Sequence, residues 1–85
     1  MRGSLIVAGI NFYMLAEGES YPNPNSGNNY SVSYVVFPYD GKWVAQKLRK
    51  GGRWIDITDQ RFDTENEAFN FTYEYTFTHK DRYKY

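Results

Sequence analysis

The sequence predicts an α+β fold, in which a four-stranded antiparallel sheet is covered by one C-terminal helix. Three observations support this. Turn-forming residues divide the chain into short extended patterns, a helix-start signal precedes the last aromatic segment, and no other segment can form a helix to cover the sheet. The strands are predicted at about 5–16, 30–37, 42–49 and 53–58, and the helix at about 65–78.

The length of 85 residues predicts a single domain, 1–85, near the lower limit of what one hydrophobic core can stabilise. The chain has no cysteine, so disulfides, thiolate metal sites and thiol redox chemistry are excluded. Its one histidine, His79, is too few for a zinc site of the usual kind. We therefore expect no metal and no cofactor, and we expect a reducing, cytoplasmic location.

Aromatic residues make up 20% of the chain, with nine Tyr, six Phe and two Trp. Each large ring can bury about 150–250 Å², so a few of them can replace a larger aliphatic core. The rings outnumber what so small a core can hold. Some tyrosines are therefore expected on the surface, where tyrosine is a common interface residue.

The first predicted strand, 5–16, begins with the apolar run LIVAGINFYML. It is apolar on both faces, which is typical of a strand inside a sheet or under a helix. The run is about half the ~20 residues that a membrane span needs, so we expect no membrane association. Residues 17–29 follow as a long polar loop with two prolines, two glycines and four asparagines.

The middle of the chain predicts three consecutive antiparallel strands. Residues 30–37 alternate between larger and smaller side chains, and the turn sequence PYDG separates them from 42–49. The glycines of KGG then allow a tight reversal into 53–58.

Residues 65–78 fit two periods. Aromatic residues alternate with polar ones as in a strand, but Thr64 and Glu67 have the spacing of a capping box at a helix start. On a helix, the polar residues also fall into one stripe. We favour the helix for two reasons: a sheet without it would leave an apolar face uncovered, and the helix-start signal is more specific than an alternation that can arise by chance in an aromatic-rich segment. The stripe consists of Glu67, Asn70, Glu74 and Thr78.

Charge is uneven along the chain although the formal net charge is zero. Residues 42–53 carry five cations and no acid, and residues 54–67 are mainly acidic. A protruding cationic hairpin could contact phosphates or an acidic partner. The charged tail, 79–85, could extend that surface, although a frayed terminus is the simpler interpretation. The candidate binding residues are Lys42, Lys47, Arg49, Lys50, Arg53, Lys80, Arg82, Tyr83 and Lys84.

A simpler interpretation of the hairpin is that its lysines protect an exposed sheet edge while Trp43 and Trp54 belong to the core. Tyr21, in the long loop, is equally open to a binding role and to a place in an ordinary connection. Catalysis finds little support, because the five serines have no histidine other than His79 to act as a base. We therefore expect no enzymatic activity.

Residues 41–69, GKWVAQKLRKGGRWIDITDQRFDTENEAF, resemble two groups of small sheet-plus-helix domains. One is the three-stranded, AP2-like arm-binding domain of phage-type tyrosine integrases, and the other is a set of short bacterial domains ending in W…FxTxxEA. The first resemblance implies that Lys47, Arg49 and Arg53 enter a DNA groove. The residues that match the shared skeleton are Gly41, Trp43, Phe62, Thr64, Glu67 and Ala68.

The size and composition also resemble those of small accessory and counter-defence proteins of AT-rich bacteriophages. This resemblance implies a binding protein that inhibits a host macromolecule by occupying its surface, in the host cytoplasm and with RNA or other nucleic acid as a potential component. The first alternative is direct RNA or DNA binding by the hairpin. The second is a small homo-oligomeric structural protein that pairs edge strands or aromatic faces.

Overall fold

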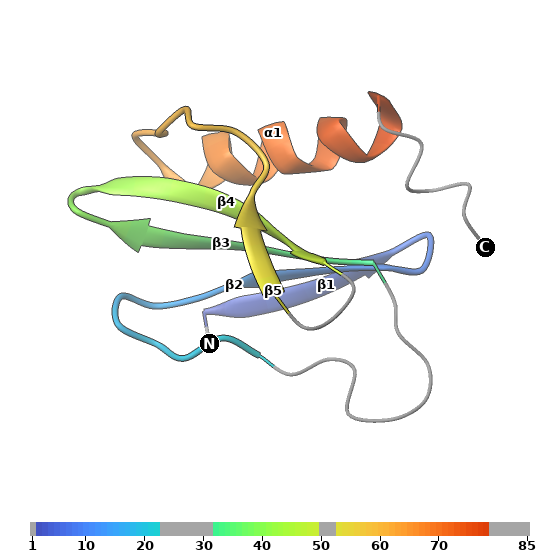
Figure 1. Cartoon of the computed structure of the whole chain (residues 1–85), viewed down its shortest axis with the longest axis horizontal. Helices are drawn as coiled ribbons and strands as arrows, with labels where there is room; N and C mark the ends of the chain where they lie inside the picture. Colours follow the sequence, from blue (N-terminus) through green and yellow to red (C-terminus); the bar gives the residue numbers. More distant parts are fainter. Residues whose placement is uncertain (1, 23–31, 50–52, 79–85) are drawn as a thin grey trace.

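The computed structural model describes residues 2–22, 32–49 and 53–78. Within these residues, five strands form one sheet and one helix packs across it (Figure 1). The predicted α+β class is confirmed. In chain order the elements are β1 Gly3–Val7, β2 Ile10–Met14, β3 Ser33–Tyr39, β4 Lys42–Arg49, β5 Arg53–Asp56 and α1 Glu65–Thr78.

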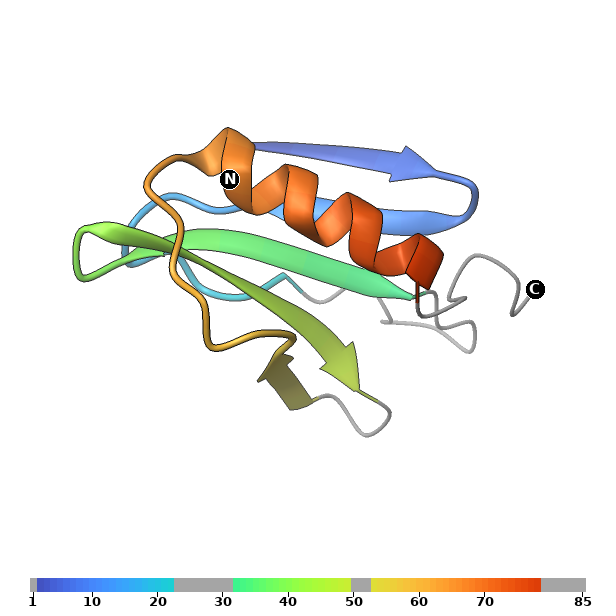
Figure 2. The same cartoon turned by 90° about the horizontal axis from the view of Figure 1, so that it is seen from above.

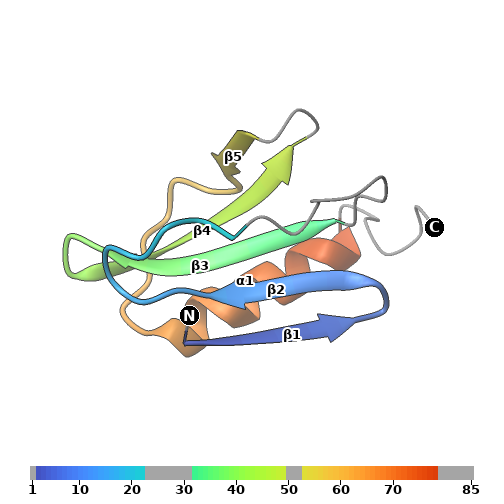
Figure 3. The same cartoon turned by 90° about the horizontal axis from the view of Figure 1, so that it is seen from below.

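The strands lie side by side in chain order, β1-β2-β3-β4-β5, and all but one pair are antiparallel. The exception is β2 with β3, which run parallel from the pair Asn11↔Ser33 to the pair Met14↔Val36. A parallel pair needs a connection that returns along the length of the sheet. The described start of that connection, residues 15–22, crosses the sheet face opposite α1 (Figure 3).

The segment 5–16, predicted as one strand, is a hairpin of β1 and β2. Ala8 and Gly9 form its turn, and both have positive φ, 53° and 80°. Two consecutive positive φ angles are the geometry of the tight turn that matches strand twist, and Gly9 adopts it readily. The sheet therefore has five strands rather than four. β1 becomes an edge strand with Leu5 and Ile6 exposed, instead of the buried strand that was expected.

The other boundaries agree closely with the sequence. Strand β4 and helix α1 match the predicted ranges 42–49 and 65–78. The strand predicted at 30–37 lies at Ser33–Tyr39, and the one predicted at 53–58 ends at Asp56. Phe62 then forms an isolated antiparallel bridge with Trp43, so β5 and Phe62 together line the second side of β4.

Helix α1 contacts the sheet through small side chains. Ala68, Thr72 and Thr76 are fully buried and follow one another at a spacing of four, so they form one line along the helix. The hydroxyl of Thr72 donates to the Ala68 carbonyl at 2.8 Å, which satisfies this polar group inside the helix itself. Because the side chains in this line are small, α1 lies close to β3 and β4 (Figure 2). The predicted polar stripe is exposed on the opposite side of the helix.

Aromatic rings fill the space on either side of this line. Phe12 of β2 lies 5.7 Å from Tyr34 and 5.4 Å from Phe69, measured between ring centroids. On the other side of the helix, Phe62 lies 5.3 Å from Phe71. Rings from strand, loop and helix thus fill much of the space between α1 and the sheet, and they pack together with buried aliphatic residues of β2, β3 and β4.

Candidate functional site

The nine predicted binding residues separate into two groups. Lys42, Lys47, Arg49 and Arg53 are described by the structure. The other five lie outside the described residues: Lys50, Lys80, Arg82, Tyr83 and Lys84.

Two of the four described cations are engaged with the protein itself. Lys42, at the start of β4, forms an ion pair with Asp63, and this hydrogen bond raises the pKa of Lys42. Lys47 is half-buried, and its ammonium nitrogen lies 5.9 Å from the centre of the Tyr34 ring, a cation–π contact. These two lysines are therefore partly committed to holding the fold together.

Arg49 and Arg53 differ from both lysines. They are exposed and lie directly opposite each other where β4 passes into β5. Neither makes an ion pair within residues 2–22, 32–49 and 53–78. Like charges at directly opposed positions repel, so an anion placed between them would relieve that repulsion. The end of the β4–β5 hairpin is therefore a cationic surface suited to an acidic group.

The sheet face opposite α1 carries an aromatic cluster beside this hairpin. Tyr21, from the β2–β3 connection, stacks on Trp54 of β5 with centroids 5.4 Å apart and planes within 8°. It also meets Phe37 of β3 edge-on at 5.9 Å. We call Tyr21, Phe37 and Trp54 the lower aromatic cluster. About half of Tyr21 remains exposed (47%), so the cluster presents a ring to solvent.

Hydrogen bonds hold Tyr21 of the lower aromatic cluster in place. The Tyr21 hydroxyl donates to Oε1 of Gln46 at 2.7 Å, and Nε2 of Gln46 donates to Asp56 at 2.8 Å. Burial, and then the charge of Asp56, raises the pKa of Tyr21, and the bond to Gln46 partly offsets the shift. The sequence left the role of Tyr21 open. Its place in a long loop was a weak signal, because nothing in the sequence links Tyr21 to Trp54.

Ion pairs connect the elements at the end of the molecule opposite the β4–β5 hairpin. Arg2 makes two hydrogen bonds to Glu65 at 2.7 and 3.3 Å, and its guanidinium lies 5.5 Å from the centre of the Trp43 ring. Together with Lys42 and Asp63, these groups join the start of β1 and β4 to the start of α1. This end is stabilised internally, so it is a weaker candidate for binding than the hairpin end.

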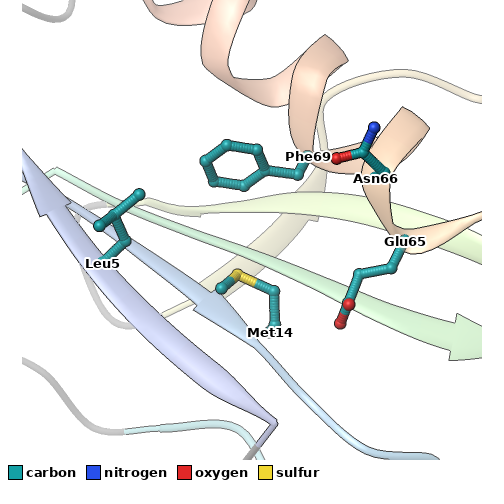
Figure 4. A pocket seen from close by; sticks show the side chains of 5 residues that line it. All are labelled: Leu5, Met14, Glu65, Asn66 and Phe69. Carbon is teal, nitrogen blue, oxygen red and sulfur yellow. The ribbon is translucent and has the colours of Figure 1, made fainter.

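A shallow groove lies between β1 and the start of α1. It is lined by Leu5, Met14 and Phe69, with Glu65 and Asn66 at its polar side, and has a volume of about 260 Å³ (Figure 4). The sequence did not predict this groove, because it arises only when residues 5–16 divide into two strands and β1 extends beyond the helix.

Residues 2–22, 32–49 and 53–78 contain no group of three or more His, Asp or Glu side chains that could hold a metal ion. No helix in this described part of the chain is long and apolar enough to cross a membrane.

No family model matches the chain, and no curated protein or solved structure is significantly similar to it.

Proposed function

We propose that the protein is a non-enzymatic binding protein that attaches to an acidic surface of a larger protein through the end of its β4–β5 hairpin. The observation that carries the proposal is the opposed pair Arg49 and Arg53, both exposed and both without an ion-pair partner in the described part of the chain. Such a pair is stabilised when carboxylates from a partner approach it.

The chemistry around the pair favours a protein over a nucleic acid as the partner. Arginine, tyrosine and tryptophan are the residues most enriched at the centres of protein interfaces, and the hairpin presents the arginine pair on one sheet face and Trp54, with Tyr21 stacked on it, on the other. The Trp54 ring is stacked against Tyr21, so this face of the indole is already covered and does not offer a platform for an unpaired base. The formal net charge is also zero, so the protein as a whole is not attracted to a polyanion such as a nucleic acid.

The compositional likeness to small accessory proteins of AT-rich bacteriophages extends the proposal. On that basis the partner is a host factor in the cytoplasm, and binding inhibits it by covering its surface in a counter-defence role. A domain of this size that buries about 800 Å² of a partner would use a standard protein interface.

The first experiment identifies the partner by affinity capture from extracts of the native host, with and without nuclease treatment. A host protein retained after nuclease treatment supports the proposal. A partner that is lost with nuclease, together with an affinity that falls steeply as salt rises, would instead indicate direct RNA or DNA binding by the same hairpin.

The second experiment measures affinity for the captured partner after charge reversal. Arg49→Glu and Arg53→Glu should each weaken binding by about tenfold or more, because each places a carboxylate against an acidic surface. Arg61→Glu is the matched control, since Arg61 is an exposed arginine outside the hairpin. Equal effects of all three substitutions on affinity would show that the hairpin is not part of the interface.

A further inference from the structure

Strand β1 is an edge strand with little protection. Gly3–Val7 pairs with β2 on one side, and within the described residues no strand pairs with its other side. Its sequence, GSLIV, contains no charge and no proline. Ile6 is 72% exposed and Leu5 45% exposed. Sheet edges in monomeric proteins normally carry charges, prolines or bulges that prevent pairing with another chain.

The other edge of the same sheet is protected in the usual way. Strand β5 has only four residues, and it begins with Arg53 and ends with Asp56. Short length and charged side chains both discourage pairing at an edge. The two edges therefore differ in kind, and it is β1 that has the chemistry of a pairing strand.

We propose that β1 pairs antiparallel with β1 of a second copy of this chain, about a two-fold axis at Leu5. In this register Leu5 faces its own counterpart, Gly3 faces Val7, and Ser4 faces Ile6. Each small residue thus lies opposite a larger one, and no charge enters the five-residue ladder. The strand is self-complementary, as an interface around a two-fold axis requires.

The size of the contact predicts a weak dimer. The ladder covers five residues and two exposed apolar side chains per copy, which is well below the ~800 Å² per partner of a standard interface. The flank of α1 above β1 adds apolar surface, because Phe77 on this side of the helix is 45% exposed. We therefore expect self-association in the micromolar range, visible as a concentration-dependent equilibrium.

The dimer does not depend on the proposed function. The pairing uses β1, whereas Arg49 and Arg53 lie at the β4–β5 end of the strand order. In the dimer two cationic hairpins would occupy the two outer sides of one continuous sheet. Charge reversal at the hairpin should leave self-association unchanged, so failure of one proposal is distinguishable from failure of the other.

The test is sedimentation velocity of the full chain over a concentration series. The unaltered chain should shift from monomer to dimer as concentration rises. Ile6→Lys places a cation on the exposed edge and should weaken self-association by about tenfold or more, with an unchanged circular dichroism spectrum. Tyr39→Lys is the matched control, because Tyr39 is a large, 60% exposed side chain at the β3–β4 turn. A chain that stays monomeric throughout, or a dimer unaffected by Ile6→Lys, would overturn the proposal.

A second measurement tests the register and remains informative if Ile6→Lys fails to fold. Because the chain has no cysteine, single cysteines can be introduced without side reactions. Leu5→Cys places two thiols opposite each other across the axis and should form a disulfide dimer under mild oxidation. Ser4→Cys, which faces Ile6 of the second copy, should cross-link much more slowly. Faster cross-linking at position 4 than at position 5 would rule out pairing about Leu5.

Discussion

The ring of Tyr21 lies flat on the indole of Trp54, with 5.4 Å between their centroids. One residue comes from the connection between β2 and β3, and the other from the edge strand β5. The stack therefore holds the β2–β3 connection against the sheet face opposite α1. Val35 and Val44, which point to that face, are at most 3% exposed, so the face opposite the helix is covered too.

Replacing Tyr21 should reveal how much the stack stabilises the fold. Tyr21→Ala removes both the stacking and the edge contact with Phe37, and we expect a loss of about 1–2 kcal/mol in the free energy of unfolding. Tyr21→Phe keeps the ring and loses only the bond to Gln46, at a cost of about 0.5 kcal/mol. Urea unfolding of Tyr39→Ala supplies the control, because Tyr39 is more exposed and its loss should change stability by at most ~0.5 kcal/mol. Similar losses for Tyr21→Ala and Tyr39→Ala would show that the stack contributes little.

Stability should fall at alkaline pH. Burial raises the pKa of Tyr13, and burial followed by the charge of Asp56 raises that of Tyr21, from an ordinary value of 10.0. The folded state then holds these phenol protons more tightly than the unfolded state. Their contribution is complete below about pH 10 and is lost as the pH rises through the raised pKa values.

The measurement is urea unfolding of the chain and of the Tyr13→Phe/Tyr21→Phe double variant, from about pH 8 to about pH 11. The double variant should lose less stability over this range. Some loss should remain, because the hydrogen bond to Asp63 raises the pKa of Lys42 and acts in the same direction. An identical decline in both proteins would contradict the assignment to the two tyrosines.

The contact between α1 and the sheet should depend on the size of residue 72. Thr72→Leu adds volume where the side chain is fully buried against the sheet, and we expect a loss of about 1–3 kcal/mol. Thr72→Val keeps the shape and removes only a hydroxyl whose acceptor, the Ala68 carbonyl, also belongs to the helical backbone ladder, so its effect should stay within ~1 kcal/mol. Thermal unfolding of the two variants compares them directly. A valine variant that is less stable than the leucine variant would mean that the hydroxyl of Thr72 contributes more to stability than the close approach of α1 to the sheet.

The helix start should depend on one side chain. The backbone N–H of Glu67 donates to Oγ1 of Thr64 at 3.1 Å, which satisfies one of the free donors of the first turn. Thr64→Ala should cost about 1 kcal/mol, whereas Thr64→Ser should be close to neutral. Denaturant unfolding gives both values. Equal stability of the alanine and serine variants would show that the cap is not used.

This cap is also the reason that the helix could be predicted. Alternating aromatic residues fit a strand equally well. The start signal at Thr64 and Glu67, together with the sheet face that needed a cover, distinguished the two. The helix meets the sheet through Ala68, Thr72 and Thr76, while the rings pack to either side. The sequence does not show this arrangement, because threonine and alanine do not mark a buried face by hydrophobicity.

The hairpin at residues 8 and 9 could not be predicted from the same rules. Alanine is unusual at positive φ, so Ala8 conceals a turn inside an apolar run, and Gly9 was the only signal. Once that turn is missed, the exposed edge of β1 and the groove beside it are missed as well. The cationic hairpin was predicted as an element, but the sequence did not show which of its cations are paired within the protein and which are exposed. Only the folded chain separates Arg49 and Arg53 from Lys42, which is paired with Asp63.

The parallel ladder between β2 and β3 has a consequence for how the chain reaches its folded state. The β1–β2 hairpin and the β3–β4–β5 meander each form from neighbouring residues, but joining them requires closure of a long loop before any bond of the ladder forms. Sequence-distant pairing slows folding. The junction of β2 and β3 should therefore set the folding rate, and substitutions there should slow refolding more than equally destabilising substitutions in either local unit.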